Sequence, residues 1–233
     1  MVDFTGGTWR SLIDGEEIAA IPDSGIVHDW DATDDSQITQ SNGTVTAIDD
    51  AVGSLELTGD ATGLTDINGV QAIDFDGADD ALTGDSPLNF GSDYSFHLVV
   101  EFSDTQQRSI FESEDGDGLR VEIDGSGSDD GRIVHQGENN MGYYEPDTEP
   151  YLLSVRYDDT DDDVPDVRIN DGEQTTETTS TTMHDPDGDM ELGSGTRDNF
   201  FGAFGRLRVY NEKQSDEDFN ETISILMDLF NID

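Results

Sequence analysis

Short segments in which apolar and polar residues alternate follow one another along most of the chain from residue 26 onward. This alternation is typical of strands that bury one face, and Gly, Asp, Asn and Ser mark the turns between them, as in Asn170-Asp171-Gly172. The expected strands are Ile26–Trp30, Thr44–Ile48, Gln71–Phe75, Asp80–Thr83, Tyr94–Phe102, Arg108–Glu112, Gly118–Ile123, Gly131–Gln136, Tyr151–Tyr157, Asp166–Asn170, Glu173–Thr179, Met190–Leu192 and Gly202–Tyr210. Many short strands with such turns predict an all-β fold, a jelly-roll sandwich of two antiparallel sheets.

One amphipathic helix is predicted at the C-terminal end, over residues 215–231. Ser215 is a good N-cap, and the three acidic residues that follow it favour the positive end of the helix dipole. Apolar residues then recur at helical spacing, at Phe219, Ile223, Leu226, Met227 and Phe230. We expect this face to pack on the sandwich or on a neighbouring subunit.

Residues 1–25 show neither the strand period nor the helix period. They contain apolar residues that should be buried against a partner, namely Trp9, Leu12, Ile13, Ile18 and Ile21. We interpret residues 1–25 as an N-terminal docking arm and residues 26–233 as the sandwich with its helix. The alternative is that the first 25 residues form an ordinary N-terminal strand of the same domain.

The charge of the chain changes this picture. Its 233 residues include 55 Asp and Glu against 10 Lys and Arg, which gives a formal net charge of −45, and Lys213 is the sole lysine. The acidic residues are interleaved with apolar runs such as Phe96–Phe102, which indicates a folded protein with an acidic surface. Self-repulsion would oppose folding in dilute buffer, whereas in molar salt the Debye length falls to about 3 Å. This composition resembles that of proteins from extreme halophiles; the alternative is an ordinary acidic protein.

Several classes of function are disfavoured by composition. The sequence contains no cysteine, so disulfides and thiolate metal sites are excluded. Its N-terminal residues lack the basic and apolar regions of a secretory signal, and no window approaches 18 apolar residues, so we expect no membrane insertion. The strong negative charge would repel a phosphate backbone, so nucleic acid is not an expected partner.

Four segments carry a resemblance to a known family. Gly69–Leu82, with Phe75-Asp76-Gly77 followed by Asp79-Asp80, resembles the opening of laminin-G-like, concanavalin-A-like jelly-roll domains. The later segments are similar to that family in the same order, and they are Tyr94–Phe102, Tyr151–Tyr157 with Asp166–Gly172, and Met190–Gly193 with Phe200–Tyr210 and the helix at Ser215. The resemblance covers about residues 65–220 and implies the same sandwich fold.

A second resemblance lies upstream. Val27–Ser36 and Gly43–Asp50 are similar to a pattern that introduces such jelly rolls in tail and surface proteins of tailed viruses. The chain departs from this pattern at Ile48, where a second Trp is usual, and at Ala51-Val52-Gly53.

Together with the charge, these resemblances imply a non-enzymatic structural protein on the virion surface of a halophilic archaeal virus, as a capsid decoration, a turret or a tail-associated protein. We expect it to form a homo-oligomer, to contact other virion proteins, and to recognise a host cell-surface glycan or glycoprotein. One alternative is a cellular, extracellular carbohydrate-binding protein of a haloarchaeon. Another is a laminarinase-like glycoside hydrolase.

The acidic residues do not form a clear catalytic pattern. A retaining glycosidase needs two carboxylates about 5 Å apart. Glu122-Ile123-Asp124 begins the alternation of acids seen in the related hydrolases, but glycine and serine follow it. Glu112 and Glu114 share one face of a strand, which chance explains in a chain with 55 acids. We therefore predict no catalytic residues.

A binding site is predicted where amides and aromatic rings occur together, because a sugar ring has an apolar face and a polar rim. The segment 137–145 has these groups at Asn139, Asn140, Tyr143 and Tyr144, and we interpret it as a ligand-binding loop. The alternative is that the two tyrosines start a strand and pack on the core.

No cofactor is required by the sequence, but a structural calcium ion or another hard cation is consistent with it. Asp185, Asp187 and Asp189 alternate around a glycine turn just before a strand, which suits the oxygen ligands of calcium. The runs Asp158–Asp163 and Asp115–Asp117 are further candidates. The alternative for each is a solvated acidic loop.

Overall fold

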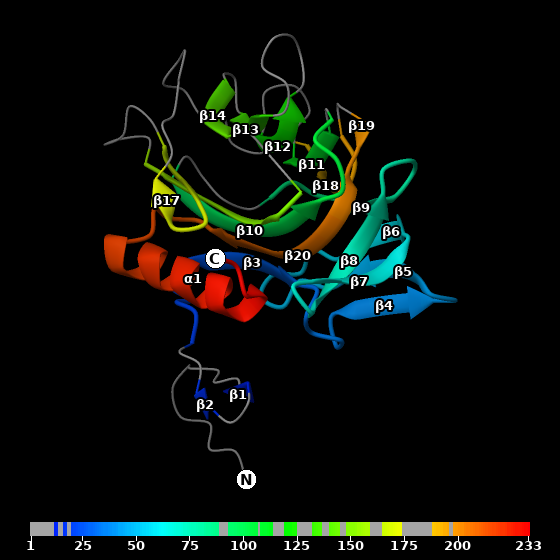
Figure 1. Cartoon of the computed structure of the whole chain (residues 1–233), viewed down its shortest axis with the longest axis horizontal. Coiled ribbons are helices and arrows are strands. Elements are labelled where there is room, and N and C mark those ends of the chain that lie inside the picture. The colour runs from blue at the N-terminus through cyan, green and yellow to red at the C-terminus, as the bar shows by residue number, and fades with distance from the viewer. Residues whose placement is uncertain are drawn as a thin grey trace.

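The computed structural model describes residues 12–13, 16–17, 20–88, 93–106, 108–113, 119–124, 132–136, 140–144, 148–158, 165–173, 188–195 and 198–233. Two large sheets of almost entirely antiparallel strands pack against each other, and one helix lies on the outside of the first sheet (Figure 1). The predicted all-β sandwich with a C-terminal helix is therefore confirmed.

The first large sheet has eight strands. Its order is β17 (Gly172–Glu173), β16 (Asp166–Ile169), β15 (Pro150–Tyr157), β10 (Tyr94–Phe102), β20 (Phe201–Tyr210), β8 (Val70–Asp76) and β7 (Gly63–Ile67), and β3 (Ile26–Asp31) also pairs with β20. The long central strands β10, β15 and β20 are buried along nearly their whole length. Because both of their faces are covered, apolar residues occur on both faces of these strands, as at Leu98 and Val99.

The second large sheet has ten strands. Its order is β14 (Asn140–Tyr144), β13 (Arg132–Gln136), β12 (Leu119–Asp124), β11 (Arg108–Ser113), β18 (Met190–Leu192), β9 (Ala81–Thr83), β6 (Leu57–Ala61), β5 (Thr44–Ile48) and β4 (Ile38–Ser41). A short strand, β19 (Asp198–Asn199), runs parallel to β11. Near the N-terminus, β1 (Leu12–Ile13) and β2 (Glu16–Glu17) pair with each other in a small sheet of their own.

The main hydrophobic core fills the space between the two large sheets. Its largest side chains are fully buried aromatic residues, among them Trp30, Phe75, Phe96, Phe111 and Phe204. The indole Nε1 of Trp30 donates to the carbonyl of Leu55 at 3.0 Å, so the one polar atom of this ring is satisfied.

The helix α1 (Asp216–Phe230) forms as the sequence predicts. The Oγ of Ser215 accepts from the backbone N–H of Asp218, and Asn231 ends the helix with a φ of 50°. The apolar face of α1 packs on the outward side of the eight-stranded sheet, in a second cluster that includes Phe219, Ile223, Leu226 and Phe230 with Val99 and Leu152. The partner of the helix is thus the sandwich itself.

Some strands differ from the prediction. The pattern gave no sign of β4, β6 or β7, and β9 begins at Ala81 instead of Asp80. The expected strand Glu173–Thr179 begins as β17 at Gly172–Glu173, and its remainder lies outside the described residues. The missed strands are short, and β6 and β7 each contain Gly and Asp, which are depleted in strands.

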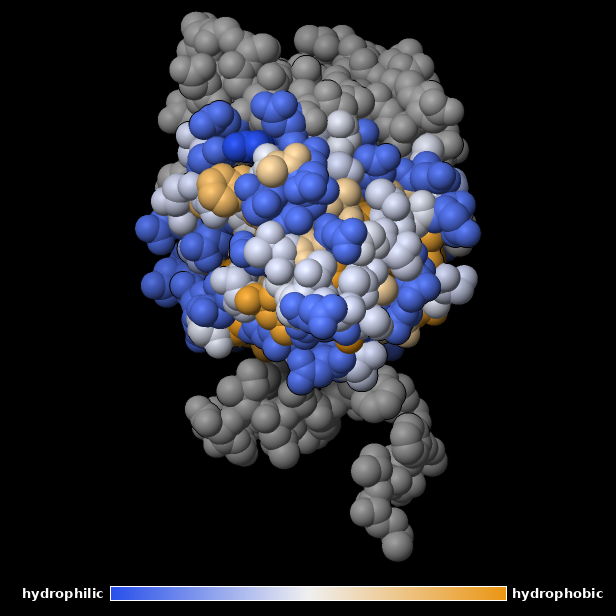
Figure 2. Space-filling view, turned by 90° about the vertical axis from the view of Figure 1, so that its right-hand side faces the viewer, coloured by the Kyte–Doolittle hydropathy of each residue, from blue (hydrophilic) through white to orange (hydrophobic). Residues whose placement is uncertain are grey.

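The surface of the described residues is strongly polar. Val52 is the single large apolar side chain that is exposed among them. Figure 2 shows the side of the molecule around β4 to β6 as mostly hydrophilic, with small and separate apolar patches. In the described part of the chain, no helix is both long and apolar enough to span a membrane.

Candidate functional site

A single row of paired residues crosses nine strands of the ten-stranded sheet. From β4 to β14 the row consists of Thr39, Ala47, Thr58, Thr83, Glu191, Glu112, Arg120, Gln136 and Asn140. Neighbouring strands lie about 4.8 Å apart, so the row is about 38 Å long. All of these residues except Ala47 are polar. We call this set the polar row.

The polar row lies on the face of the sheet that points away from the core. The adjacent row, which contains Leu82, Leu192, Phe111 and Val121, is completely buried in the main core. Successive residues of a strand point to opposite faces, so the members of the polar row with described side chains, from Thr39 to Glu112, point outward. Its threonines Thr39, Thr58 and Thr83 are exposed, and Glu191 is half-buried.

Two glutamates stand opposite each other in the middle of the polar row, but they differ in access. Glu112 is only 6% exposed. A Cβ added at Gly195 would collide with the Glu112 carboxylate and would also lie 2.8 Å from Oγ of Ser109, so the backbone at residue 195 passes directly over this carboxylate. Glu191 accepts from Oγ of Ser194 at 2.9 Å. Of this pair, Glu191 is therefore the accessible carboxylate.

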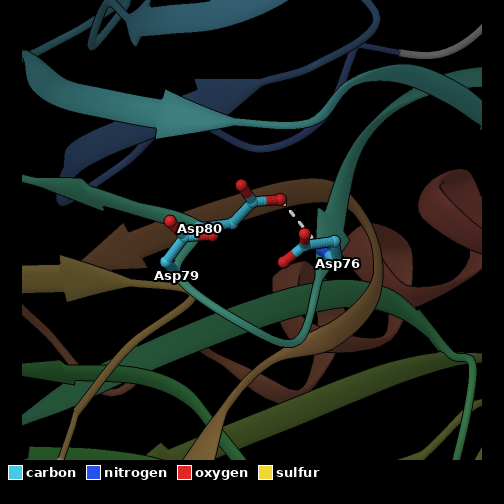
Figure 3. A group of neighbouring side chains, drawn as sticks. All are labelled: Asp76, Asp79 and Asp80. Carbon is cyan, nitrogen blue, oxygen red and sulfur yellow. Dashed lines mark hydrogen bonds between the residues drawn. The ribbon is translucent and has the colours of Figure 1, made fainter.

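A second candidate site is the acidic turn between β8 and β9. One carboxylate oxygen from each of Asp76, Asp79 and Asp80 lies within 4.8 Å of the others, and the three side chains gather at the turn (Figure 3). Gly77 occupies the turn with a φ of +75°, a conformation that L side chains rarely adopt. Three carboxylates at such spacing are chemically suited to a hard cation.

Hydrogen bonds give Asp80 a structural role in this turn. It is 7% exposed, and its Oδ2 accepts from N of Thr62 at 2.9 Å, Oγ1 of Thr62 at 2.7 Å and N of Asp76 at 2.8 Å. These bonds tie the turn to the residue between β6 and β7. The turn also affects its neighbour Asp74. Burial raises the pKa of Asp74, and the negative charges of Asp80 and Asp76 raise it further.

Every arginine whose side chain the structure describes pairs with a carboxylate. Arg108 bonds Asp104, Arg156 bonds Asp166 and Asp216, Arg168 lies 3.5 Å from Asp166, Arg206 bonds Asp29 and Asp31, and Arg208 lies 3.4 Å from Asp29. These cations are thus already compensated within the fold. In the ten-stranded sheet, the arginine with a described side chain is Arg108, and its pairing with Asp104 leaves no uncompensated charge for an acidic ligand there.

The residues of the predicted ligand-binding loop are placed in a strand. Asn140, Tyr143 and Tyr144 belong to β14, at the edge of the ten-stranded sheet, so the expectation of a loop here is wrong. The backbone of Asn140 pairs with Gln136 and forms the end of the polar row, while Tyr144 pairs with Ile133. Asn139 lies outside the described residues. The binding role of this segment stays a prediction.

The other predicted sites are described only in part. Asp189 is exposed, and Asp185 and Asp187 lie outside the described residues, so the cation site expected there stays a prediction. Trp9 and Ile18 of the arm are also outside the described residues, and Leu12 and Ile13 form β1. Ile21 is partly buried and packs on the second cluster, together with Val70, Met227 and Leu229.

The sequence contained a signal for the acidic turn but none for the polar row. Four acids occur within seven residues from Asp74 to Asp80, around a glycine, and the cation argument that we applied to Asp185–Asp189 applies there too. Glu112 and Glu191, in contrast, come from distant parts of the chain. Their pairing depends on the strand order of the folded sheet.

Comparison with known proteins supports the fold. No family model matches the chain, and no curated protein matches it. A sialidase from Trypanosoma rangeli, in complex with 2,3-difluoro-KDN, superposes with a TM-score of 0.60 at 12% identity over 92% of this chain and 34% of the sialidase. The chain thus spans about a third of the length of that protein.

Two further solved structures are similar. Domain 4 of AbnA, a GH43 extracellular arabinanase from Geobacillus stearothermophilus, in complex with arabinotriose, has a TM-score of 0.56 at 15% identity over 88% of this chain and 97% of that domain. The W1252A mutant of HCR D/C VPI 5995 has a TM-score of 0.59 at 11% identity, over 87% of this chain and 52% of that one. At such identities the likeness shows a shared β-sandwich fold.

Proposed function

We propose that this chain is a non-catalytic carbohydrate-binding domain that takes a neutral oligosaccharide along the polar row. The observation that carries this proposal is the row itself, in which the described side chains form an outward line of threonine hydroxyls with the carboxylate of Glu191. These groups donate to and accept from sugar hydroxyls. The proposal is supported by the arabinanase domain, which is named in complex with arabinotriose and matches this chain over 97% of its own length.

The charges favour a neutral ligand over an acidic one. The chain carries a net charge of −45, and Glu191 is an accessible carboxylate in the middle of the polar row. Arg108, the arginine with a described side chain in the same sheet, is paired with Asp104, so it does not offset the repulsion of a sugar carboxylate. We therefore expect a different preference from that of a protein that binds sialic acid.

The same row argues for binding without hydrolysis. A retaining glycosidase brings two carboxylates to opposite sides of one glycosidic bond, about 5 Å apart. Glu112 and Glu191 are paired across strands, but the backbone at Gly195 covers Glu112. One accessible carboxylate can bind a sugar hydroxyl, whereas the double-displacement mechanism needs two.

The predicted tyrosines extend this proposal to one end of the row. Tyr143 and Tyr144 lie in β14, next to Asn140. We propose that at least one of their rings stacks on a terminal sugar of the bound chain. The hydroxyls of Thr58 and Thr83 would then bind the middle of the same oligosaccharide.

We propose the surface of a virion from a halophilic archaeal virus as the setting for this binding. The upstream resemblance at Val27–Ser36 and the acidic composition support it. The domain would form an oligomer with other virion proteins and would contact host glycans; an extracellular haloarchaeal protein is the alternative setting. Immunogold labelling of purified particles tests this, and particles without label would contradict it.

The binding proposal is tested by calorimetry in molar NaCl, with arabinotriose as the neutral probe and sialyllactose as the acidic one. We expect binding of the neutral probe and none of the acidic probe. The double variant Thr58→Val/Thr83→Val removes two hydroxyls from the polar row and should weaken binding about tenfold.

The matched control is Thr65→Val, because Thr65 is an exposed strand threonine of the eight-stranded sheet. It should bind like the unchanged protein. Equal weakening in both variants would contradict the polar row as the site, and absence of binding to a panel of neutral oligosaccharides would contradict the function itself. Release of reducing ends from the probe would contradict the non-catalytic assignment.

A further inference from the structure

We infer that Arg208 forms the centre of a binding site for a small monovalent anion, on the outward face of the eight-stranded sheet. Arg208 lies in β20 and is 5% exposed. Its Nε and Nη1 atoms are completely buried and have no hydrogen-bond partner among the described residues. A buried guanidinium with two unused donors is costly unless an acceptor is supplied.

The nearest carboxylate does not supply that acceptor, because it is used by another arginine. Both oxygens of Asp29 accept from Arg206, at 2.8 Å and 2.7 Å, and Nη1 of Arg206 lies 2.7 Å from Asp31. Nε of Arg208 lies 3.4 Å from Asp29 Oδ2 without forming a hydrogen bond. The planar fork of Arg206 matches the carboxylate geometry, and Arg208 is left beside it.

The residue on the other side of Arg208 does not supply an acceptor either. His97 is its register partner in β10, and both ring nitrogens of His97 are engaged, with Ser154 at 2.8 Å and Gln214 at 2.7 Å. The ring of Tyr210 lies under the guanidinium, with a Cζ-to-centroid distance of 5.6 Å, and its hydroxyl donates to the carbonyl of Pro22.

The surroundings limit the size and charge of the occupant. The chain segment that includes Pro22 is fastened next to Arg208 by the bond from Tyr210 and by a bond from N of Asn211 to the carbonyl of Gly25, each 2.9 Å long. Arg206, Arg208, Asp29 and Asp31 together carry no net charge. In a protein of net charge −45, a polyvalent anion would be strongly repelled here, whereas one small monoanion suits the two donors.

This chemistry has two sources in the medium, a free halide or a small free carboxylate such as formate. The two sources predict different responses to the anion of the medium, so they can be separated.

The experiment measures the melting temperature in NaCl and in sodium gluconate at equal sodium concentration, because gluconate is a much larger anion than chloride and the two donor atoms of Arg208 are buried. With a free halide, the protein should melt about 2 to 4 °C higher in NaCl, which corresponds to about 1 kcal/mol for a chain of this size. Arg208→Met should abolish this difference. Arg156→Met is the control, because the donors of Arg156 bond Asp166 and Gln214, and it should keep the difference.

With a free carboxylate as the ligand, the protein should melt higher in sodium formate than in sodium gluconate or NaCl at equal sodium concentration. Arg208→Met should abolish this difference as well. If Arg208→Met does not fold, crystals of the unchanged protein soaked in bromide decide the question by an anomalous peak at Arg208. A protein with neither response, or with only a water at Arg208, would overturn the inference.

Discussion

Nε2 of His97 lies 2.7 Å from Oε1 of Gln214, which joins the middle of β10 to the residue before the N-cap of α1. An amide oxygen can only accept, so Nε2 carries a proton, and Nδ1 lies 2.8 Å from Oγ of Ser154. Burial lowers the pKa of the imidazole to about 3. The ring is therefore neutral near pH 7, and Nδ1 then accepts from Ser154.

We expect this histidine to make stability depend on pH. Its pKa in the folded state lies below the unfolded value of about 6.5, so its contribution is fully present above pH 6.5 and is lost as the pH falls toward 3, by at most about 1.4 kcal/mol per pH unit. Denaturant unfolding of the protein and of His97→Gln, from pH 8 to pH 4.5, measures this. The variant should lack that part of the slope, and parallel pH profiles would contradict the assignment.

The acidic turn should separate a structural carboxylate from a solvated one. Asp80→Ala leaves the N–H groups of Thr62 and Asp76 without their acceptor, so we expect a loss of about 2 to 4 kcal/mol in the free energy of unfolding. Asp79 lies in the same turn, but its carboxylate is exposed. Asp79→Ala should therefore change the free energy of unfolding by less than about 0.5 kcal/mol. Chemical denaturation measures both, and equal effects would refute the structural role of Asp80.

The edge strand β14 should contribute to binding more than to stability. Tyr143→Ala/Tyr144→Ala should weaken binding of an arabino-oligosaccharide long enough to reach from Thr83 to β14, or adsorption to host cells, about tenfold, because aromatic stacking on the terminal sugar is lost. The melting temperature should stay within about 2 °C, since the strand lies at the end of the sheet. Unchanged binding would leave Tyr143 and Tyr144 without a recognition role.

Two deletions should distinguish a docking arm from a part of the domain. Removal of residues 1–19 should leave the melting temperature nearly unchanged. Removal of residues 1–25 should lower it by about 4 to 8 °C, because the packing of Ile21 and the bond from Tyr210 to Pro22 are lost. If the shorter deletion also prevents incorporation into an assembly, residues 1–19 act as the arm. A normal assembly of the shorter protein would refute that role.

The acidic surface should make the fold depend on salt. We expect the melting temperature to fall when NaCl is lowered from molar to about 0.1 M, where the Debye length is about 10 Å and the repulsion among carboxylates is less screened. Circular dichroism during heating measures it. A melting temperature that is the same at both salt concentrations would refute the halophilic interpretation.

Parts of the fold were predictable because their signals are local. The strand expected at Tyr94–Phe102 is found with the same bounds as β10, and the helix expected over residues 215–231 is found as α1 between the caps Ser215 and Asn231. In β10 a long apolar run favours a buried strand, and in α1 the cap and the apolar spacing act within a few residues.

Other parts were not predictable because their cause lies far away in the sequence. β6 and β7 have weak intrinsic preference and form strands because β5, β9 and β8 offer them backbone partners. The segment Asn140–Tyr144 was expected to be a loop, but it forms the edge strand β14 by pairing with β13. Main-chain hydrogen bonds to a neighbouring strand decided these cases, and they leave no pattern in the segment itself.

The sequence by itself therefore determined the class of the fold, the position of the helix and the acidic surface, because each of these depends on composition or on spacing within one segment. The tertiary structure alone decided which polar residues share a surface. Strand order and register place Glu112 opposite Glu191, although the two residues are far apart in the sequence. They also place Asp29 where it bonds Arg206 and forms no hydrogen bond with Arg208. Both the polar row and the anion site at Arg208 arise from that pairing, since side chains on neighbouring strands interact only when the register places them side by side.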